Sequence, residues 1–368
     1  MAKPLKLAII YGGQSTEHAV SIESALNLVQ SLDTQKYTPL LIRINESGSW
    51  HLQTNSQPAL QQAALPGFIP TLWPEHAPAI ALLPDYPGQL INLHTTRIES
   101  EIDVVFPLVH GRTGEDGSLQ GFLNMANVPY VGCDVMSSSI IMDKDISKRL
   151  LKEAGLPVVD HLAFNTLRYS PTYDEIVDAL GDYFFVKPAN SGSSIGISAV
   201  TRKSEFRHAM HLAQHFDHKV VFEQGIRGRE LECGVVGNHT CWTSAVGEVL
   251  CSKPFYDYEA KYWDTESTHL RVPADIDKRM TEQVQYLSER AFQALDCQGM
   301  ARVDFFLKGD QLWINELNTL PGLTSTSLFP KLWEHSGIAF SELCDKLIEL
   351  AIQGHQQKQT LKTTLDCF

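Results

Sequence analysis

The chain has 368 residues, which predicts two or three domains, and its 43 acidic against 30 basic residues leave a formal net charge of −13. The acidic excess argues against a general nucleic-acid or anionic-membrane binder, and no stretch reaches the ~18–20 apolar residues of a membrane span. The seven cysteines include no Cys-x-x-Cys pair, so we expect reduced cytoplasmic thiols rather than a disulfide framework or a zinc site.

The first third of the chain alternates strands with helices. Strands are expected over 6–10 and 37–44, and we interpret the basic start as leading into the first strand rather than as a signal peptide. The apolar run at 101–109 predicts a buried strand. Residues 53–90 hold seven prolines and are interpreted as a surface excursion without long regular elements. This order favours an α/β domain with a parallel sheet, and its first helix has one apolar face: Val20, Ala25, Leu28, Val29 and Leu32.

The remaining chain has three helical patterns and several short strands. Helices are expected over 116–129, 142–157 and 336–353. Strands are expected over 182–189, 193–200, 218–226, 230–238, 301–308 and 311–318, and Gly309–Asp310 is a hairpin turn signal between the last two.

A segment rich in glycine and serine, Lys187–Ser198, has the sequence KPANSGSSIGIS. In a Walker-type loop the lysine follows the glycines and begins a helix, whereas Lys187 precedes them and strands are expected on both sides. We interpret the segment as a hairpin lid whose backbone N–H groups form an anion nest, with Lys187 adding charge from the strand. An ordinary Gly–Ser hairpin turn with a surface lysine is the alternative.

Three oxygen donors are expected on one face of the last hairpin. Glu316 and Asn318 are two residues apart, so they point the same way, and Asp304 can lie opposite them. Oxygen donors suit Mg²⁺, and burying them unpaired among apolar strands is costly. Arg302 shares the face of Asp304 and either neutralises it or holds a substrate anion. The alternative is a solvated sheet face with cross-strand pairs.

Other polar features are ambiguous when taken singly. The loop NTLPGLTSTS after the hairpin offers backbone N–H groups to a carboxylate or oxyanion, but ordinary loops look alike. Lys144 opens a helix, where the dipole disfavours a cation, which indicates another use. Two further residues have structural explanations that compete with functional ones. Glu17 lies in a first helical turn, where a carboxylate is stabilising, and His110 lies at the C-terminal end of a strand. Residues 255–267 are a lid candidate or a surface excursion.

Four histidines recur on one helical stripe: His208, His211, His215 and His218. Apolar residues take the opposite face, so we interpret the segment as an amphipathic surface helix rather than a metal site.

Seven blocks taken together resemble the D-alanine–D-alanine ligases of the ATP-grasp fold, in that family's order and over nearly the whole chain. The blocks are GGQSTEHAVSIESA, HGRTGEDGSLQG, MDKDISK, VKPANSGSSIGIS, YEAKY, ARVDFF and NELNTLPGLTSTS. The resemblance implies a mixed α/β, three-domain ATP-grasp fold: an N-terminal Rossmann-like domain at 1–130, a central subdomain with the glycine-serine lid at 131–222, and a C-terminal subdomain with the metal site at 223–368.

The resemblance also implies the roles of individual residues. ATP would contact Lys144, Lys187, Ser193, Ser194, Glu223, Ile226, Glu230 and Lys261. Two Mg²⁺ ions, with Mn²⁺ as a substitute, would bind Asp304, Glu316 and Asn318. The two substrate molecules would contact Glu17, His110, Lys261, Arg302, Gly322, Ser327 and Leu328. The residues implied in catalysis are Glu17, Ser193, Tyr262, Arg302 and Ser327.

The implied reaction joins two D-alanines to D-alanyl-D-alanine through a D-alanyl phosphate, for peptidoglycan precursors, in a cytoplasmic homodimer. A carboxylate is a poor acyl donor, so ATP activates it, and water must be excluded from the acyl phosphate. Tyr262 is present where D-lactate-using relatives differ, which favours the dipeptide. A D-alanine–D-lactate or D-alanine–D-serine ligase and a non-catalytic nucleotide-binding protein are the alternatives.

Overall fold

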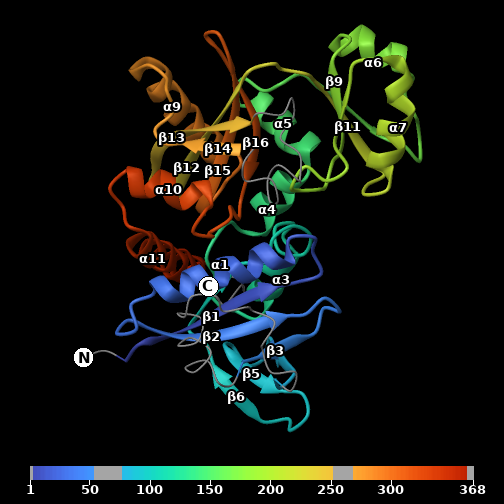
Figure 1. Cartoon of the computed structure of the whole chain (residues 1–368). Coiled ribbons are helices and arrows are strands. Elements are labelled where there is room, and N and C mark those ends of the chain that lie inside the picture. The colour runs from blue at the N-terminus through green and yellow to red at the C-terminus, as the bar shows by residue number, and fades with distance from the viewer. Residues whose placement is uncertain (1–2, 54–76, 252–267, 363–368) are drawn as a thin grey trace.

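The computed structural model of the chain describes residues 3–53, 77–251 and 268–362 (Figure 1). Within these ranges no helix has the length and apolar character needed to cross a membrane. The chain builds a mixed α/β fold, as the sequence predicts, in which the described residues form one largely parallel sheet and three antiparallel sheets.

The N-terminal sheet has the order β3-β2-β1-β7, in which β1 pairs in parallel with β2 and β7. The predicted strands at 6–10 and 37–44 and the helix between them are confirmed. The run at 101–109 forms a shorter strand than expected, because the chain turns after Glu101 and only Val104–Pro107 joins the sheet. The elements are β1 (Leu5–Gly12), α1 (His18–Ser31), β2 (Tyr37–Ile44), β3 (Trp50–Leu52), β7 (Val104–Pro107) and α3 (Ser118–Met125).

The proline-rich excursion carries only short strands where it is described, and residues 54–76 lie outside the described ranges. Three strands form an antiparallel sheet in the order β4 (Ile80–Leu82), β5 (Gln89–Asn92) and β6 (Ile98–Glu101). Ile80, Leu82 and Leu90 are buried in one cluster with Ile42 of the parallel sheet. The excursion is therefore packed onto the domain.

The central sheet has the order β10-β9-β11-β8 and is antiparallel throughout. With its helices it forms the separate lobe at the upper right of Figure 1, around an aromatic core that includes Phe184 and Phe222. Ser193 and Ser194 have φ values of +52° and +57°, so the strand predicted from residue 193 begins only at Ser198. The elements are β8 (His161–Asn165), α6 (Tyr173–Leu180), β9 (Phe184–Pro188), β10 (Ser198–Val200), α7 (Lys203–Gln214) and β11 (Lys219–Gln224).

The C-terminal sheet has the order β14-β13-β12-β15-β16. Gly309, with φ +60°, turns β15 into β16, which confirms the predicted hairpin. Two short helices, α4 (Val135–Met142) and α5 (Lys144–Glu153), lie between the lobes (Figure 1). The other elements are β12 (Arg229–Gly237), β13 (Cys241–Cys251), β14 (Thr268–Arg271), α9 (Lys278–Ala294), β15 (Gly299–Lys308), β16 (Gln311–Asn318), α10 (Leu328–His335) and α11 (Phe340–Gln359).

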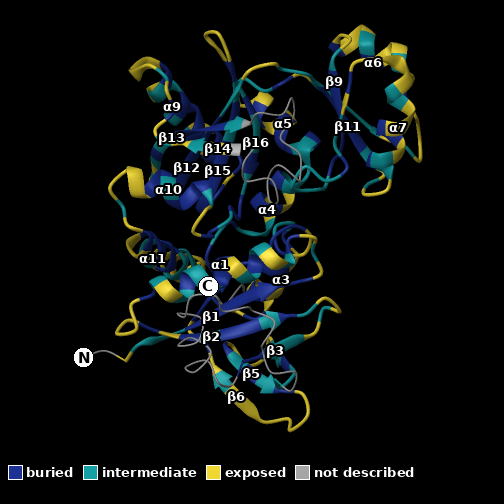
Figure 2. Cartoon of the chain, in the orientation of Figure 1, coloured by how far each residue is buried: buried dark blue, intermediate teal, exposed yellow. Residues whose placement is uncertain are grey.

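The last helix joins the two ends of the chain. Leu343, Leu347 and Ile348 of α11 are fully buried in one cluster with Leu28 of α1 and Phe106 of β7. Figure 2 shows dark-blue, buried residues along α11 and along β1 and β2 of the parallel sheet. This packing fixes the N-terminal domain against the C-terminal sheet, and so fixes the loops that meet between them.

The structure describes the side chains of most of the cysteines and of the four histidines at 208–218. The cysteines that the structure describes with their side chains are free thiols, namely Cys133, Cys233, Cys241, Cys297 and Cys344. The four histidines are exposed, while Ala209, Met210 and Ala213 of α7 are buried, so the amphipathic surface helix is confirmed for its first part. The helix is shorter than predicted, because it ends at Gln214: His215 is its C-cap residue, and His218 lies beyond it.

Candidate active site

Two cavities adjoin at the centre of the molecule. The first, of about 310 Å³, lies between the central and C-terminal sheets and is here called the inter-sheet cavity. The second, of about 450 Å³, lies between the N-terminal domain and the loop after β16 and is called the loop cavity. Four residues line both cavities: Ser193, Glu232, Arg302 and Glu316.

Lys144 connects the glycine-serine loop to the metal-site hairpin. It is the first residue of α5, and its Nζ donates to the Ser191 carbonyl at 2.7 Å and lies 3.3 Å from Glu316 Oε2. The dipole penalty for a cation at a helix start is offset by these oxygens. Lys144 therefore presents a fixed positive charge on the wall of the inter-sheet cavity.

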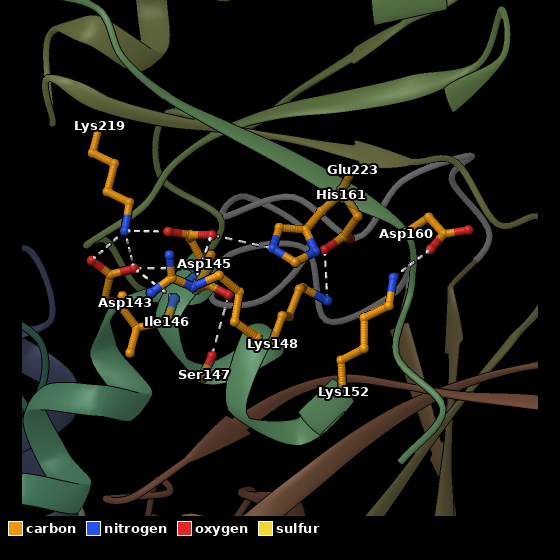
Figure 3. A network of polar contacts seen from close by, with 12 residues as sticks. Asp143, Asp145, Ile146, Ser147, Lys148, Lys152, Asp160, His161, Lys219 and Glu223 are labelled. Carbon is orange, nitrogen blue, oxygen red and sulfur yellow. Dashed lines mark hydrogen bonds and ion pairs between the residues drawn. The ribbon is translucent and has the colours of Figure 1, made fainter. Parts of the chain in front are cut away.

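The start of α5 is itself anchored to the central lobe (Figure 3). Asp143 caps the helix by accepting from Ile146 N, and Lys219 Nζ of β11 lies 2.9 and 3.0 Å from its two oxygens. The same Nζ is 2.6 Å from Asp145 Oδ2. Burial opposes ionisation of Asp145, but Lys219 outweighs it and lowers the pKa of that carboxyl. These contacts hold Lys144 in place.

Lys187 faces the inter-sheet cavity and pairs with a buried glutamate behind it. Its Nζ donates to Glu223 Oε1 at 2.5 Å, and Lys148 Nζ lies 2.8 Å from Glu223 Oε2. Burial alone would raise the pKa of Glu223, but the two ammonium groups reverse that effect and bring it to about 2. Glu223, which the resemblance implies as an ATP contact, is 1% exposed and is not among the residues that line the cavity; its contact there is Lys187, which does line it.

The three predicted metal ligands lie on neighbouring hairpin positions. Asp304 pairs with Glu316 across β15 and β16, and Arg302 pairs with Asn318. Arg302 Nε and Nη2 donate to the two oxygens of Asp304 at 2.7 and 2.6 Å. Within the described residues no three His, Cys, Asp or Glu side chains form a metal cluster by themselves. Two carboxylates and an amide oxygen fit a hard cation that takes its other ligands from phosphate and water.

The loop cavity brings N-terminal and C-terminal residues together. Glu17 is the N-cap residue of α1, is only 8% exposed and lines this cavity. His110 Nδ1 contacts the Leu320 carbonyl at 3.2 Å, and since a carbonyl can only accept, the proton is on Nδ1. Ser327 is the N-cap residue of α10, and its Oγ contacts Thr324 Oγ1 at 2.7 Å instead of capping the helix.

The remaining predicted residues divide into three groups. Ser194, Ile226 and Glu230 line the inter-sheet cavity, together with Asp304. Asn318, Gly322 and Leu328 line the loop cavity. Lys261 and Tyr262, with the lid candidate at 255–267, lie outside the described residues.

Two charged residues of this region were not predicted from the sequence. Glu232 lines both cavities, and its Oε2 lies 2.9 Å from Arg302 Nε. It is two residues after Glu230 on β12, so strand alternation places both side chains on one face of the sheet. This alternation could have identified Glu232 as a site residue from the sequence. Lys148 is 2% exposed behind the inter-sheet cavity. It is four residues after Lys144 on α5, and nothing in the local sequence distinguishes it from a surface lysine.

Comparison with known proteins agrees with this arrangement. The model described as "D-ala D-ala ligase N-terminus" matches residues 6–133, and "D-ala D-ala ligase C-terminus" matches residues 150–349. D-alanine–D-alanine ligase A of Salmonella typhimurium is 44% identical over 371 residues, covering 99% of this chain and 100% of that protein.

Solved structures agree as well. The D-alanine–D-alanine ligase from Coxiella burnetii is 36% identical with a TM-score of 0.83, covering 97% of each chain. The VanG D-Ala:D-Ser ligase from Enterococcus faecalis is 33% identical with a TM-score of 0.83, covering 95% of this chain and 100% of that one. The two family models and the full-length similarity place the chain in the D-alanine–D-alanine ligase family, which has the ATP-grasp fold.

Proposed function

We propose that the chain joins two D-alanines to D-alanyl-D-alanine at the expense of ATP, through a D-alanyl phosphate, for peptidoglycan precursor synthesis. The observation that carries this proposal is the wall of four residues shared by the two cavities. A phosphoryl donor in one cavity and a carboxylate in the other would meet at this wall. Arg302 and Glu316 stand at that junction, where charge develops during phosphoryl transfer.

The inter-sheet cavity is the proposed ATP site. Lys144 and Lys187 supply positive charge toward the phosphates, and the loop around Ser193 and Ser194 supplies backbone N–H groups in left-handed conformations that favour an anion nest. Ile226 and Glu230 would hold the nucleoside, and Lys261 is a further proposed ATP contact. Glu223 acts from behind, by holding Lys187.

Asp304, Glu316 and Asn318 are the proposed ligands of two Mg²⁺ ions, for which Mn²⁺ substitutes. The metal supplies charge neutralisation for the transferring phosphoryl group. Arg302 is held on the same face by Asp304 and Glu232, so its guanidinium is oriented before substrate arrives.

The loop cavity is the proposed site for both amino acids. Glu17 would accept the ammonium group of the first D-alanine, and His110 lies on the same wall. Arg302 and the Gly322 backbone face the developing oxyanion. Ser327 and the Leu328 N–H, at the start of α10, would bind the second carboxylate, because unpaired N–H groups at a helix start favour anions. The family resemblance implies that Lys261 would assist there and that Tyr262 would link Ser193 to Glu17.

The protein is proposed to act as a cytoplasmic homodimer with ATP and two D-alanines as its partners. Its functional parts are the N-terminal domain at 1–130, the central subdomain at 131–222 and the C-terminal subdomain at 223–368. The separate sheets support this division in outline, although β11 (Lys219–Gln224) of the central sheet runs two residues past the proposed boundary at 222.

The decisive experiment offers D-alanine, D-lactate and D-serine in competition and identifies the products by mass spectrometry, with ADP release followed in parallel. We expect D-alanyl-D-alanine as the main product and ADP release that needs a D-amino acid and Mg²⁺. If the main product is a depsipeptide, the second substrate is D-lactate rather than D-alanine; if it is D-alanyl-D-serine, the second substrate is D-serine. ADP release without any D-amino acid, or none at all, would reject a ligase.

A further inference from the structure

Glu223 is a buried carboxylate shared by two lysines from different elements. Lys187 of β9 is 2.5 Å from one oxygen and Lys148 of α5 is 2.8 Å from the other. Lys187 lines the inter-sheet cavity, whereas Lys148 lies behind it and is 2% exposed. The two lysines therefore have the same partner but different access to a ligand (Figure 3 shows Lys148 and Glu223).

Lys148 also reaches the C-terminal sheet. Its Nζ donates to the Asn315 carbonyl of β16 at 2.6 Å, next to Glu316. A single buried ammonium group thus joins α5, the central sheet through Glu223, and the hairpin that holds the proposed metal ligands. Lys148 therefore contacts both of the sheets between which the inter-sheet cavity lies.

The cluster has two ammonium groups for one carboxylate. Burial lowers the pKa of Lys148, while the carboxyl of Glu223 is held ionised. An anion arriving in the cavity would supply the missing negative charge, and Lys187 is the lysine that can turn toward it.

If Lys187 turns to a phosphate, it gives up its contact with Glu223. A carboxylate left buried without a counter-ion is strongly unfavourable, so Glu223 alone would hold Lys187 back. We propose that Lys148 is a positioning residue that serves as the permanent counter-ion of Glu223 and thereby releases Lys187 to the nucleotide phosphates. This inference rests on the proposed function only in identifying the anion as the phosphates of ATP.

The test measures binding of a non-hydrolysable ATP analogue with Mg²⁺ by calorimetry, together with KM for ATP and for D-alanine. Lys148→Met should weaken analogue binding and raise KM for ATP by about tenfold or more, with KM for D-alanine changed by less than about twofold. The control is Lys152→Met, one helical turn further along α5. Its Nζ lies 3.7 Å from Asp160 at the surface, and the variant should match the wild type.

The double variant Lys148→Met/Glu223→Gln separates this role from simple packing. The neutral amide no longer retains Lys187. The affinity for the nucleotide analogue should therefore be several-fold higher than that of Lys148→Met. The proposal would be overturned if the double variant bound the analogue no more tightly than Lys148→Met does. It would also be overturned if Lys148→Met bound the analogue as tightly as the wild type does. Thermal unfolding checks that each variant is folded.

Lys148→Gln, which keeps a donor for Asn315, replaces the methionine variant if that one does not fold; it should show the same loss and the same recovery. A wild-type protein that binds the analogue but makes no dipeptide would reject the proposed function and leave the Lys148 comparison decisive through binding alone.

Discussion

Arg302 Nε lies 2.9 Å from Glu232 Oε2 while the same guanidinium donates to both oxygens of Asp304. Burial opposes the charge on Arg302, but these carboxylates outweigh it and raise its pKa well above the usual value. A metal ion that takes Asp304 as a ligand would compete with Arg302 for it. Glu232 then remains to hold the guanidinium at the junction of the cavities.

Glu232→Gln should therefore raise the Mg²⁺ concentration needed for half-maximal ADP release by roughly 10-fold, because Arg302 would stay with Asp304. Titration of Mg²⁺ at saturating ATP and D-alanine measures this. Glu282→Gln is the matched control, since Glu282 forms only an exposed pair with Lys278 at 3.6 Å. An unchanged Mg²⁺ requirement in Glu232→Gln would contradict the competition.

Glu316→Gln should reduce turnover by roughly 100-fold or more, since an amide has no charge to hold the metal and to pair with Lys144 at 3.3 Å. Calorimetric titration of Mn²⁺ into the protein with an ATP analogue gives a readout independent of turnover, and we expect weaker metal binding. Retained activity at ordinary Mg²⁺ concentrations would refute the metal role.

Asp145→Asn should lower the free energy of unfolding by about 1–2 kcal/mol at neutral pH, because it removes the 2.6 Å contact with Lys219. The pKa of Asp145 is lowered in the folded state by Lys219 in spite of burial. The stabilisation is therefore complete above the unfolded pKa of about 3.9 and is lost as pH falls through the folded pKa.

Urea unfolding of Asp145→Asn and the wild type, at neutral pH and then at decreasing pH, tests this dependence. The difference in unfolding free energy should shrink in acid. Asp160→Asn, at an exposed pair with Lys152, is the control and should show little difference at any pH. A difference for Asp145→Asn that does not depend on pH would indicate lost packing rather than a lost charge.

Leu347→Ala should destabilise the protein by about 2–5 kcal/mol, because Leu347 is fully buried where α11 meets the N-terminal domain. Gln353→Ala on the exposed side of α11 should change the unfolding free energy by less than about 0.5 kcal/mol. Chemical denaturation followed by circular dichroism measures both. Equal stabilities would mean that the core does not join the two ends of the chain as described.

Local pattern was enough to predict much of the fold. The alternation of β15 and β16 and the Gly309–Asp310 turn placed Asp304 opposite Glu316, and the structure has this pairing. The helix start at Lys144 and the hairpin built from β9 and β10 were also predicted, because caps, turns and strand period depend on near neighbours. The sequence did not predict that β10 begins only at Ser198, since nothing in the residue types required positive φ at Ser193 and Ser194.

The sequence by itself determined which segments carry charge and which face each side chain takes. Only the tertiary structure decided that Lys187 and Lys148 share Glu223, that Glu232 holds Arg302, and that two cavities adjoin at Arg302 and Glu316. Strand and helix periods are set by backbone geometry within a few residues. The pairing of a buried charge is set by which distant segments exclude water around it, and that depends on how the sheets and helices pack together.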